Sequence, residues 1–283
     1  MQLDDPEWLE EQYNNRTRVP DFPEHFARWA RDSERLRSEV PCSLDIAYGD
    51  ASGERLDVFP TRQRDAPVLV FIHGGYWRAL DKSDHSFVGA AFARAGACAV
   101  VPNYDLCPAV TIPQIVMQQV RALAWTWRHI AEHGGDPRRI VVAGHSAGGH
   151  LAAMLMACDW PAFDGGLPEN LVGKALAISG LYELEALRRT PSLQASLQLT
   201  PQQVRMASPA LLPPPRGGAL YTVAGAEESA EFLRHNALMQ QAWGAARVPV
   251  CEALPGLNHF SILEDLVNPG TRLNALALEL LGL

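Results

Sequence analysis

Short apolar runs alternate with longer amphipathic stretches over most of the chain. Residues 68–72 are continuously apolar, as expected for a central strand that is covered on both faces. Further strands are predicted at 98–101, 140–142, 175–179, 219–223 and 248–253. Apolar residues at helical spacing predict helices at 83–94, 113–133, 231–243 and 262–281. The alternation predicts an α/β fold, with a mostly parallel sheet and helices on both faces.

The first 40 residues differ from this pattern, because they are polar, aromatic and interrupted by prolines. The spacing of Phe22, Phe26 and Trp29 after Asp21 predicts a short amphipathic helix that is capped at its start. We interpret residues 1–40 as an N-terminal arm that lies over the core. A share of this arm in covering an active site is the less favoured alternative.

Two other segments add features to the predicted sheet. Strands expected at 43–48 and 55–59 are joined by turn-forming residues at 49–53, which predicts a hairpin. Residues 180–217 contain several prolines and break the strand–helix alternation, which predicts a lid-like insertion. No linker divides the chain, so residues 1–283 are expected to form one domain.

The composition excludes several classes of function. Hydrophobic residues make up 47% of the chain and charged residues 20%, which is typical of a folded protein. The net charge of −8, without a basic cluster, argues against nucleic acid and membrane as partners. No apolar run reaches the roughly 18 residues of a membrane span, so we expect a cytoplasmic protein. The five scattered cysteines are interpreted as reduced. A small-molecule substrate and a homodimer are the default expectations for partners.

Chemistry is indicated first by the run Gly144-His145-Ser146-Ala147-Gly148, which joins the strand at 140–142 to an apolar, helix-prone segment. The glycines leave room for a tight turn from strand to helix, so that Ser146 is raised above the sheet. The free N–H groups of the following helix then face the place where an oxyanion would form. Ser146 is therefore the candidate nucleophile, with a glycine-rich turn without chemistry as the alternative.

A serine nucleophile needs a histidine base, which in this arrangement lies late in the chain. His259 lies in the loop between the last predicted strand and the last predicted helix. His150 and His235 lie within predicted helices instead. His259 is therefore the candidate base.

The base needs an acid that orients it, and this acid should follow the strand that ends at residue 223. Glu227, Glu228 and Glu231 occur there, and Glu231 is also explained as a charge at a helix start. We choose Glu228 and keep Glu227 in reserve.

The oxyanion hole needs backbone donors from a second loop. Gly74 and Gly75 directly follow the strand at 68–72, and glycines let the backbone approach a substrate oxygen closely. The Ala147 N–H adds a donor from the turn at Ser146. Gly74, Gly75 and Ala147 are therefore the candidate oxyanion hole.

Taken together, these motifs resemble those of the serine-dependent kynurenine formamidases (arylformamidases), members of the α/β-hydrolase superfamily related to the hormone-sensitive-lipase-like esterases. The resembling stretches are Tyr-Asn-Asn-Arg at 13–16, His-Gly-Gly-Tyr-Trp at 73–77, Asn-Tyr-Asp-Leu-Cys-Pro at 103–108, Gly-His-Ser-Ala-Gly-Gly-His-Leu at 144–151, Asp-Trp at 159–160 and Asn-His-Phe at 258–260. The lipase-like relatives usually carry glycine where Tyr76 stands and aspartate where His145 stands. In the formamidases the acid precedes a Glu-Phe pair by three residues, which indicates Glu228, but counting forward from Gly225 reaches Glu227, so both stay open.

The resemblance implies hydrolysis of N-formyl-L-kynurenine to kynurenine and formate in tryptophan catabolism, without a metal or cofactor. Metal-dependent formamidases form a separate family with clustered histidines, which this chain lacks. Formyl is the smallest acyl group, so Tyr76 and Trp77 are expected to close the acyl side of the site and to offer aromatic walls to an arylamine. The candidates for binding the substrate carboxylate are Arg16, Arg78, Arg188, Arg189 and Arg205. The alternatives are a broad carboxylesterase for short acyl groups and a non-catalytic binding protein.

Overall fold

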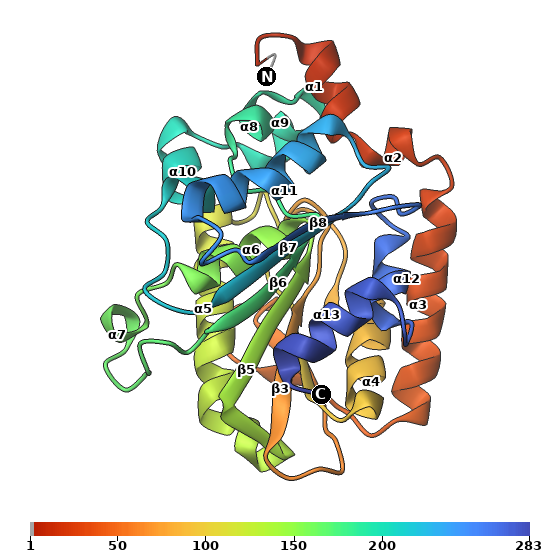
Figure 1. The fold of residues 1–283 in the computed structure, drawn as a ribbon, viewed down its shortest axis with the longest axis vertical. Helices are drawn as coiled ribbons and strands as arrows, with labels where there is room; N and C mark the ends of the chain where they lie inside the picture. The colour runs from red at the N-terminus through yellow and green to blue at the C-terminus, as the bar shows by residue number, and fades with distance from the viewer. Residues whose placement is uncertain (1–2) are drawn as a thin grey trace.

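An eight-stranded sheet runs through the middle of the computed structural model, which describes residues 3–283 (Figure 1). The strands are β1 (Ser43–Ala47), β2 (Arg55–Phe59), β3 (Ala66–Ile72), β4 (Cys98–Pro102), β5 (Gly135–His145), β6 (Lys174–Ile178), β7 (Ala219–Gly225) and β8 (Val250–Leu254). Their order in the sheet is β1-β2-β4-β3-β5-β6-β7-β8. Strands β3 to β8 are parallel, whereas β1 and β2 form an antiparallel hairpin that pairs with β4. The predicted α/β fold, the mostly parallel sheet and the hairpin are confirmed.

Helices cover both faces of this sheet, as predicted. The α-helices are α1 (Pro6–Tyr13), α2 (Asn15–Arg18), α3 (Phe22–Glu39), α4 (Ser86–Ala95), α5 (Ile112–His129), α6 (Ala147–Met156), α7 (Trp160–Phe163), α8 (Glu185–Arg189), α9 (Pro191–Leu197), α10 (Pro201–Met206), α11 (Ala230–Trp243), α12 (Ile262–Val267) and α13 (Arg272–Leu281). Short 3-10 turns are η1 (Lys82–His85), η2 (Ile130–His133) and η3 (Pro209–Leu211). No helix within residues 3–283 is both long enough and apolar enough to cross a membrane.

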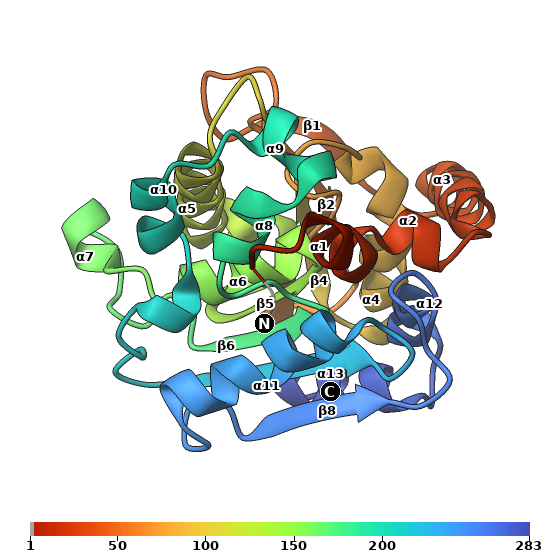
Figure 2. The ribbon, with the colours of Figure 1, turned by 90° about the horizontal axis from the view of Figure 1, so that it is seen from above.

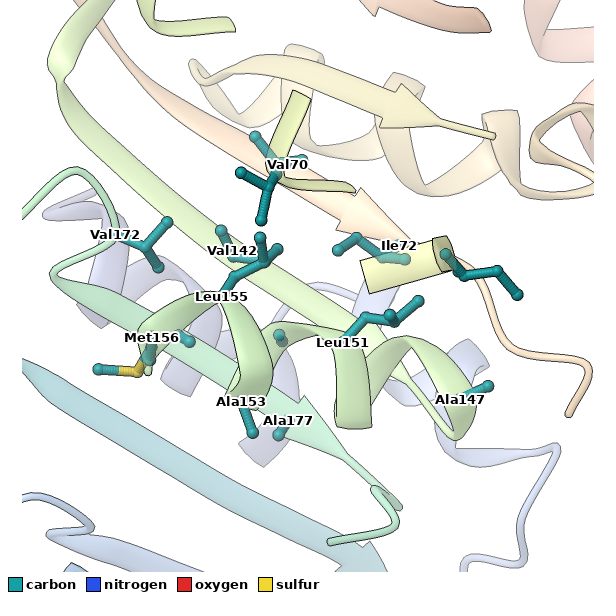
Figure 3. Packing of buried hydrophobic residues seen from close by; sticks show 14 of the residues in the cluster. Val70, Ile72, Val142, Ala147, Leu151, Ala153, Leu155, Met156, Val172 and Ala177 are labelled. Atoms are coloured by element: carbon teal, nitrogen blue, oxygen red, sulfur yellow. The ribbon is translucent and has the colours of Figure 1, made fainter. Parts of the chain in front are cut away.

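The two faces of the sheet carry separate hydrophobic cores, because successive strand residues point to opposite sides. Val70 of β3 belongs to the core that includes α5, α6 and α11. Its neighbour Phe71 belongs to the core that includes α3, α4, α12 and α13. Figure 3 shows Leu155 of α6 lying next to Val142 of β5 and Leu151 of α6 lying towards Ile72 of β3. The strand that leads to Ser146 and the helix that follows it are therefore anchored in a common core.

Helix α3 is longer than the predicted short helix, since it has 18 residues. Its buried face continues past Trp29 through Ser33 and Leu36. Because Ser33 is polar, the apolar spacing in the sequence does not show that the buried face continues. Ser33 is nevertheless fully buried, and its Oγ accepts a hydrogen bond from the Phe87 N–H (3.1 Å). The predicted cap is also wrong, because Asp21 makes no side-chain hydrogen bond to the start of the helix.

The single helix predicted at 262–281 is also corrected, because it consists of α12 and α13. Pro269 and Gly270 separate them, and Gly270 has a φ of 90° that favours glycine. A left-handed residue cannot continue a right-handed helix, so the chain changes direction there.

The segment 180–217, predicted as a lid-like insertion, contains α8, α9, α10 and η3. Helix α1 of the N-terminal arm packs against α8, α9 and α11. Figure 2 views the molecule from above and shows α1 in dark red across this end, beside α8 and α9. Two segments far apart in the sequence thus meet above one end of the sheet.

Candidate active site

Ser146 lies on a tight turn between β5 and α6, as the sequence pattern predicts. Its backbone is strained, with φ 56° and ψ −115°. The turn brings backbone groups so close that neither flanking glycine leaves room for a side chain. A Cβ on Gly144 would lie 2.1 Å from the Gly148 carbonyl oxygen, and a Cβ on Gly148 would lie 2.0 Å from the Ile72 carbonyl oxygen. The two glycines therefore allow the close packing of β3, β5 and α6 that presents Ser146.

His259 lies in the loop between β8 and α12, and its ring is held by Glu228, which follows β7. The His259 Nδ1 is 2.7 Å from Glu228 Oε2, and Glu228 is only 6% exposed. The other carboxylate oxygen of Glu228 accepts hydrogen bonds from Ser179 Oγ (2.5 Å) and from the Gly225 N–H (2.7 Å). An ionised carboxylate only accepts, so the proton of the histidine pair lies on Nδ1. The Nε2 of His259 is then free to act as a base.

Neither of the other candidate acids contacts His259 through its carboxylate in the described part of the chain. Glu227 is exposed. Glu231 is buried at the start of α11, where it accepts a hydrogen bond from Tyr13 Oη (2.8 Å) and pairs with Arg234 (2.8 Å). Glu228 is therefore the carboxylate in position to orient His259.

The histidines set aside in the sequence analysis have structural partners. His150 Nε2 contacts the Ala207 carbonyl oxygen at 2.6 Å, and His235 Nδ1 accepts a hydrogen bond from the Tyr182 N–H (3.0 Å). Burial lowers the pKa of His150 to about 4 and holds the pKa of His235 well below its usual value. Both are neutral and packed in the core near neutral pH.

The candidate oxyanion donors surround the position of the nucleophile. A Cβ on Gly74 would lie 3.1 Å from Ser146 Cβ, so the Gly74 backbone passes directly beside the serine. Gly75 lines the same pocket as Ser146 and has a φ of 104°. Ala147 is the first residue of α6, so its N–H has no acceptor within the helix. The three N–H groups come from the two segments that the sequence indicated.

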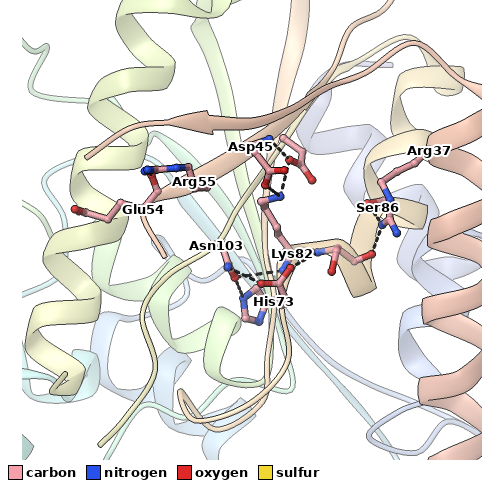
Figure 4. A network of polar contacts seen from close by, with 11 residues as sticks. Arg37, Asp45, Glu54, Arg55, His73, Lys82, Ser86 and Asn103 are labelled. Carbon is pink, nitrogen blue, oxygen red and sulfur yellow. Dashed lines mark hydrogen bonds and ion pairs between the residues drawn. The ribbon is translucent and has the colours of Figure 1, made fainter. Parts of the chain in front are cut away.

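A network of buried polar groups supports the loop that carries Gly74 (Figure 4). His73 Nδ1 lies 2.8 Å from the Gly74 carbonyl oxygen, and His73 Nε2 lies 3.0 Å from Asn103 Oδ1. The same Asn103 oxygen accepts a hydrogen bond from the Lys82 N–H (3.3 Å), and Lys82 Nζ pairs with the buried Asp57 (2.7 Å). These contacts hold the loop that carries Gly74 in a fixed position against the sheet.

The expectation that Trp77 forms an aromatic wall is wrong. Trp77 is 0% exposed and packs edge-to-face on His150, with ring centroids 4.9 Å apart. Positive φ angles at Tyr76 (50°) and Trp77 (54°) turn the chain so that only Tyr76 faces the pocket. Tyr76 donates a hydrogen bond through its hydroxyl to the Tyr13 carbonyl oxygen (2.7 Å).

The N-terminal arm lies over the core, as expected, and residues 13–16 with Phe26 and Trp29 also line the pocket at Ser146. The arm therefore has a share in covering this pocket as well, which was the less favoured alternative. Its aromatic lining comes from Tyr13 of α1 and from Phe26 and Trp29 of α3, together with Tyr76 and Phe260. Helix α9 of the 180–217 segment contributes Ser192. Aromatic side chains thus surround the serine, although most of them come from elements that the sequence analysis did not assign to the site.

Two residues that sequence reasoning missed support the base. Ser179, directly after β6, donates to Glu228, as described above. His145 contacts the His259 carbonyl oxygen through Nε2 at 2.8 Å, and the two rings lie 4.7 Å apart. Burial, with a contribution from His259, holds the pKa of His145 well below its usual value, so its ring is neutral. His145 lies inside the serine motif, and its position next to the nucleophile was the available signal.

The five arginine candidates fall into two groups. Arg188 and Arg189 pair with Glu185 on α8, and Arg205 is exposed on α10. Arg16 and Arg78 line the pocket that contains Ser146. Only these two are in position to meet a substrate.

Comparison with known proteins identifies the family. The family model described as alpha/beta hydrolase fold matches residues 69–242. A kynurenine formamidase from Danio rerio is 30% identical over 266 residues, which cover 91% of this chain and 88% of that protein. A kynurenine formamidase from Drosophila melanogaster is 28% identical over 88% of each chain. A crystal structure of a protein from Silicibacter sp. TM1040, proposed to be a thioesterase, superposes with a TM-score of 0.82 at 28% identity and covers 93% of this chain and 96% of that chain. The chain belongs to the α/β-hydrolase fold family and, within it, to the kynurenine formamidases.

Proposed function

We propose that this protein is a serine hydrolase that cleaves the formamide of N-formyl-L-kynurenine, or of a similar aryl formamide, to an arylamine and formate. The observation that carries the proposal is the pairing of His259 with the buried Glu228 beside Ser146. This pairing occurs in a chain that belongs to the kynurenine formamidases. The same residue types act together in other serine hydrolases, where the acid fixes the tautomer of the base.

Acylation begins when Nε2 of His259 takes the proton of Ser146 Oγ and the oxygen attacks the formyl carbon. The negative charge moves to the former carbonyl oxygen, where N–H groups of Gly74, Gly75 and Ala147 stabilise it. The C–N bond then breaks, and the arylamine leaves with the proton that His259 returns. An aniline is a better leaving group than an alkylamine, so its departure depends less on protonation by His259.

Deacylation repeats the same steps with water. His259 takes a proton from the water as it attacks the formyl ester on Ser146, and the ester C–O bond breaks as His259 returns the proton to Oγ. The products are formate and the free serine. The ion pair with Glu228 stabilises His259 each time that it carries the extra proton.

The lining of the pocket favours a small acyl group attached to an aromatic amine. The Gly74 backbone passes directly beside Ser146, and the hydrogen bond of Tyr76 to the arm fixes its ring. A bulky acyl chain at Ser146 would therefore clash with the Gly74 backbone or with the Tyr76 ring. Phe26, Trp29 and Phe260 offer apolar faces on which an aromatic ring can pack. Cleavage of activated short-chain esters is expected as a side activity, because such a site also accepts a good alkoxide leaving group.

The direct test is product analysis with N-formyl-L-kynurenine as the substrate. The purified protein should release the arylamine and formate in equal amounts, and Ser146→Ala should release neither while keeping the wild-type unfolding temperature. Equal turnover by Ser146→Ala would exclude the serine mechanism. A cytoplasmic location, action without a metal or cofactor, and assembly into a homodimer stay predictions from the sequence.

A further inference from the structure

We propose that Arg16 and Arg78, together with the side-chain amide of Asn15, form a subsite for a carboxylate of the substrate. The inference rests on the proposed function and deepens it, since it assigns the residues that recognise the amino-acid end of an aryl formamide. All three residues line the pocket that contains Ser146 and His259. The subsite would therefore bind one end of a molecule whose other end is at the nucleophile.

Arg16 has a held side chain but no acidic partner. Its guanidinium carbon lies 5.3 Å from the centroid of the Phe22 ring and 5.7 Å from that of Phe26. Within residues 3–283 it forms no ion pair and no side-chain hydrogen bond. Stacking on two rings keeps a guanidinium in place while its N–H groups stay available.

Arg78 is likewise without a carboxylate partner in the described part of the chain. It donates hydrogen bonds from Nη1 to the Ser192 carbonyl oxygen (2.6 Å) and to Ser196 Oγ (2.8 Å), both on α9. Burial, and then the neighbouring Arg16, lower the pKa of Arg78. The two cations are therefore close enough to repel each other, and an anion between them would remove that repulsion.

Glu10 is the nearby acid, but neutral groups occupy its oxygens. Its Oε1 accepts a hydrogen bond from Asn14 Nδ2 (2.7 Å), and its Oε2 accepts one from the Ser192 N–H (3.1 Å). Glu10 thus links the arm to α9 and makes no ion pair with Arg16 or Arg78 among the contacts of residues 3–283. It leaves the pair of guanidinium groups available to a ligand.

Asn15 and Trp29 supply a second, independent observation. Asn15 is 5% exposed, and its Nδ2 is buried without an acceptor in the described residues. The same holds for Nε1 of Trp29, which also lines the pocket. Buried N–H groups without acceptors are costly, and a carboxylate supplies several acceptor sites at once. Two cations and two residues with an unpartnered buried donor line one pocket, which matches an anionic ligand better than a neutral one.

The subsite also connects recognition with the chemistry. Arg78 lies on the loop that begins with the oxyanion glycines Gly74 and Gly75, and Arg16 lies on the arm. Tyr76 lies between these glycines and Arg78 on the loop, and its hydroxyl donates a hydrogen bond to the Tyr13 carbonyl oxygen of the arm. A carboxylate held by both arginines would fix the arm over the pocket while the formamide lies at Ser146.

Arg16→Gln is the decisive variant, because Arg16 makes no hydrogen bond that the fold needs, whereas Arg78 also holds α9. The two substrates are N-formyl-L-kynurenine and N-formyl-2-aminoacetophenone, which keeps the aryl formamide and lacks the amino-acid group. We expect kcat/KM for the first to fall roughly 10- to 100-fold, mainly through KM, because a charged hydrogen bond to the carboxylate is lost. Turnover of the second should stay within about twofold, and Arg16→Lys should recover part of the loss.

Arg18→Gln is the matched control, since Arg18 lies exposed on the same short helix α2 and does not line the pocket. Arg18→Gln should leave kcat/KM for both substrates unchanged. An equal loss on both substrates in Arg16→Gln, or no loss on either, would overturn the subsite.

A separate binding measurement distinguishes failure of the subsite from failure of the proposed function. If the wild-type protein cleaves neither formamide, the proposed function is wrong. The subsite is then judged by calorimetric titration of L-kynurenine into Ser146→Ala with and without Arg16→Gln. Weaker binding in the double variant supports the subsite, whereas equal binding to both proteins, or binding to neither, overturns it.

Discussion

At the scale of single residues, the orientation of His259 depends on one carboxylate that accepts three hydrogen bonds. Glu228 accepts from His259, Ser179 and the Gly225 N–H, at 2.7, 2.5 and 2.7 Å. Ser179 and Gly225 hold one carboxylate oxygen, and His259 contacts the other. The negative charge is therefore presented to Nδ1 of His259 in one geometry, which is what a base with a defined tautomer requires.

Replacing this carboxylate should cost activity without removing the nucleophile. We expect Glu228→Gln to lower kcat by a factor on the order of 10³ to 10⁴, because the amide neither fixes the tautomer nor stabilises the protonated ring. The control is Glu227→Gln, since Glu227 is exposed one position earlier. Its kcat should stay within about twofold of wild type. A larger effect at 227 than at 228, measured by steady-state turnover, would show that the wrong acid has been assigned.

At this scale the sequence singled out the candidate nucleophile and base, and it favoured Glu228 as the acid without excluding Glu227. Of the two predicted aromatic walls, Tyr76 lines the pocket and Trp77 does not. Ser146 and His259 follow from a local motif and from chain order. The choice between Glu227 and Glu228 depends on how the loop after β7 turns, and counting residues does not show this. The orientation of Trp77 depends on two positive φ angles at non-glycine residues, which a sequence pattern does not reveal.

At the scale of elements, the close approach of β3 to the start of α6 presents Ser146. A Cβ on Gly148 would lie 2.0 Å from the Ile72 carbonyl oxygen and 2.8 Å from that of His73. Both atoms are backbone, so no side chain can move aside. The helix would have to separate from the strand.

We therefore expect Gly148→Ala to lower the free energy of unfolding by about 3 kcal/mol or more, as overpacking against backbone does. Gly165→Ala is the matched control, because a Cβ at Gly165 would meet nothing within 4 Å. Its effect should be within about 0.5 kcal/mol. Urea unfolding of both variants checks this, and similar midpoints would contradict the packing argument.

Element types were predicted better than element ends. The strands were recognised because their residues are continuously apolar where both faces are covered. The length of α3 was missed because Ser33 interrupts the apolar stripe, and the break between α12 and α13 was missed because Pro269 and Gly270 were not given weight as a stop signal. The first error arises where local composition and tertiary burial disagree, whereas the second concerns a stop signal that the local sequence does contain.

At the scale of the whole molecule, buried neutral histidines link stability to pH. His150 has a pKa of about 4 in the folded protein because it is buried. Burial also lowers the pKa of His73, His145 and His235, and lowers that of His85 to about 3. A histidine in the unfolded chain has a pKa of about 6.5. Below that pH the unfolded state binds protons that the folded state does not, so stability decreases as the pH falls from about 6.5 towards 4.

Removing one such group should reduce this dependence. We expect His150→Gln to be less stable than wild type at neutral pH, because its contact with the Ala207 carbonyl is altered, but to lose less stability on acidification. The slope should decrease by up to about 1.4 kcal/mol per pH unit, which corresponds to one proton. Met117→Gln, at an exposed position of α5 that carries no titrating group, should keep the wild-type slope. Urea unfolding at a series of pH values measures this, and an unchanged slope in His150→Gln would contradict it.

The position of the N-terminal arm is the part of the whole-molecule arrangement that the sequence did not determine. The arm reaches the pocket through long-range contacts, such as the hydrogen bond from Tyr13 Oη to Glu231 on α11 and that from Tyr76 Oη to the Tyr13 carbonyl oxygen. Neither contact leaves a periodic signal in the sequence. The arrangement explains why residues from the first 30 positions line the pocket that contains the candidate nucleophile Ser146.

We claim that the Ser146 pocket prefers an aryl formamide to a simple ester, and comparing kcat/KM for the two substrates on one preparation tests this preference. N-formyl-L-kynurenine and a short-chain p-nitrophenyl ester are measured side by side, with Ser146→Ala as the blank. We expect a higher kcat/KM for the formamide, with both activities absent in the blank. A formamide that is barely hydrolysed beside an ester that is rapidly cleaved would contradict the claim and would make the protein a carboxylesterase.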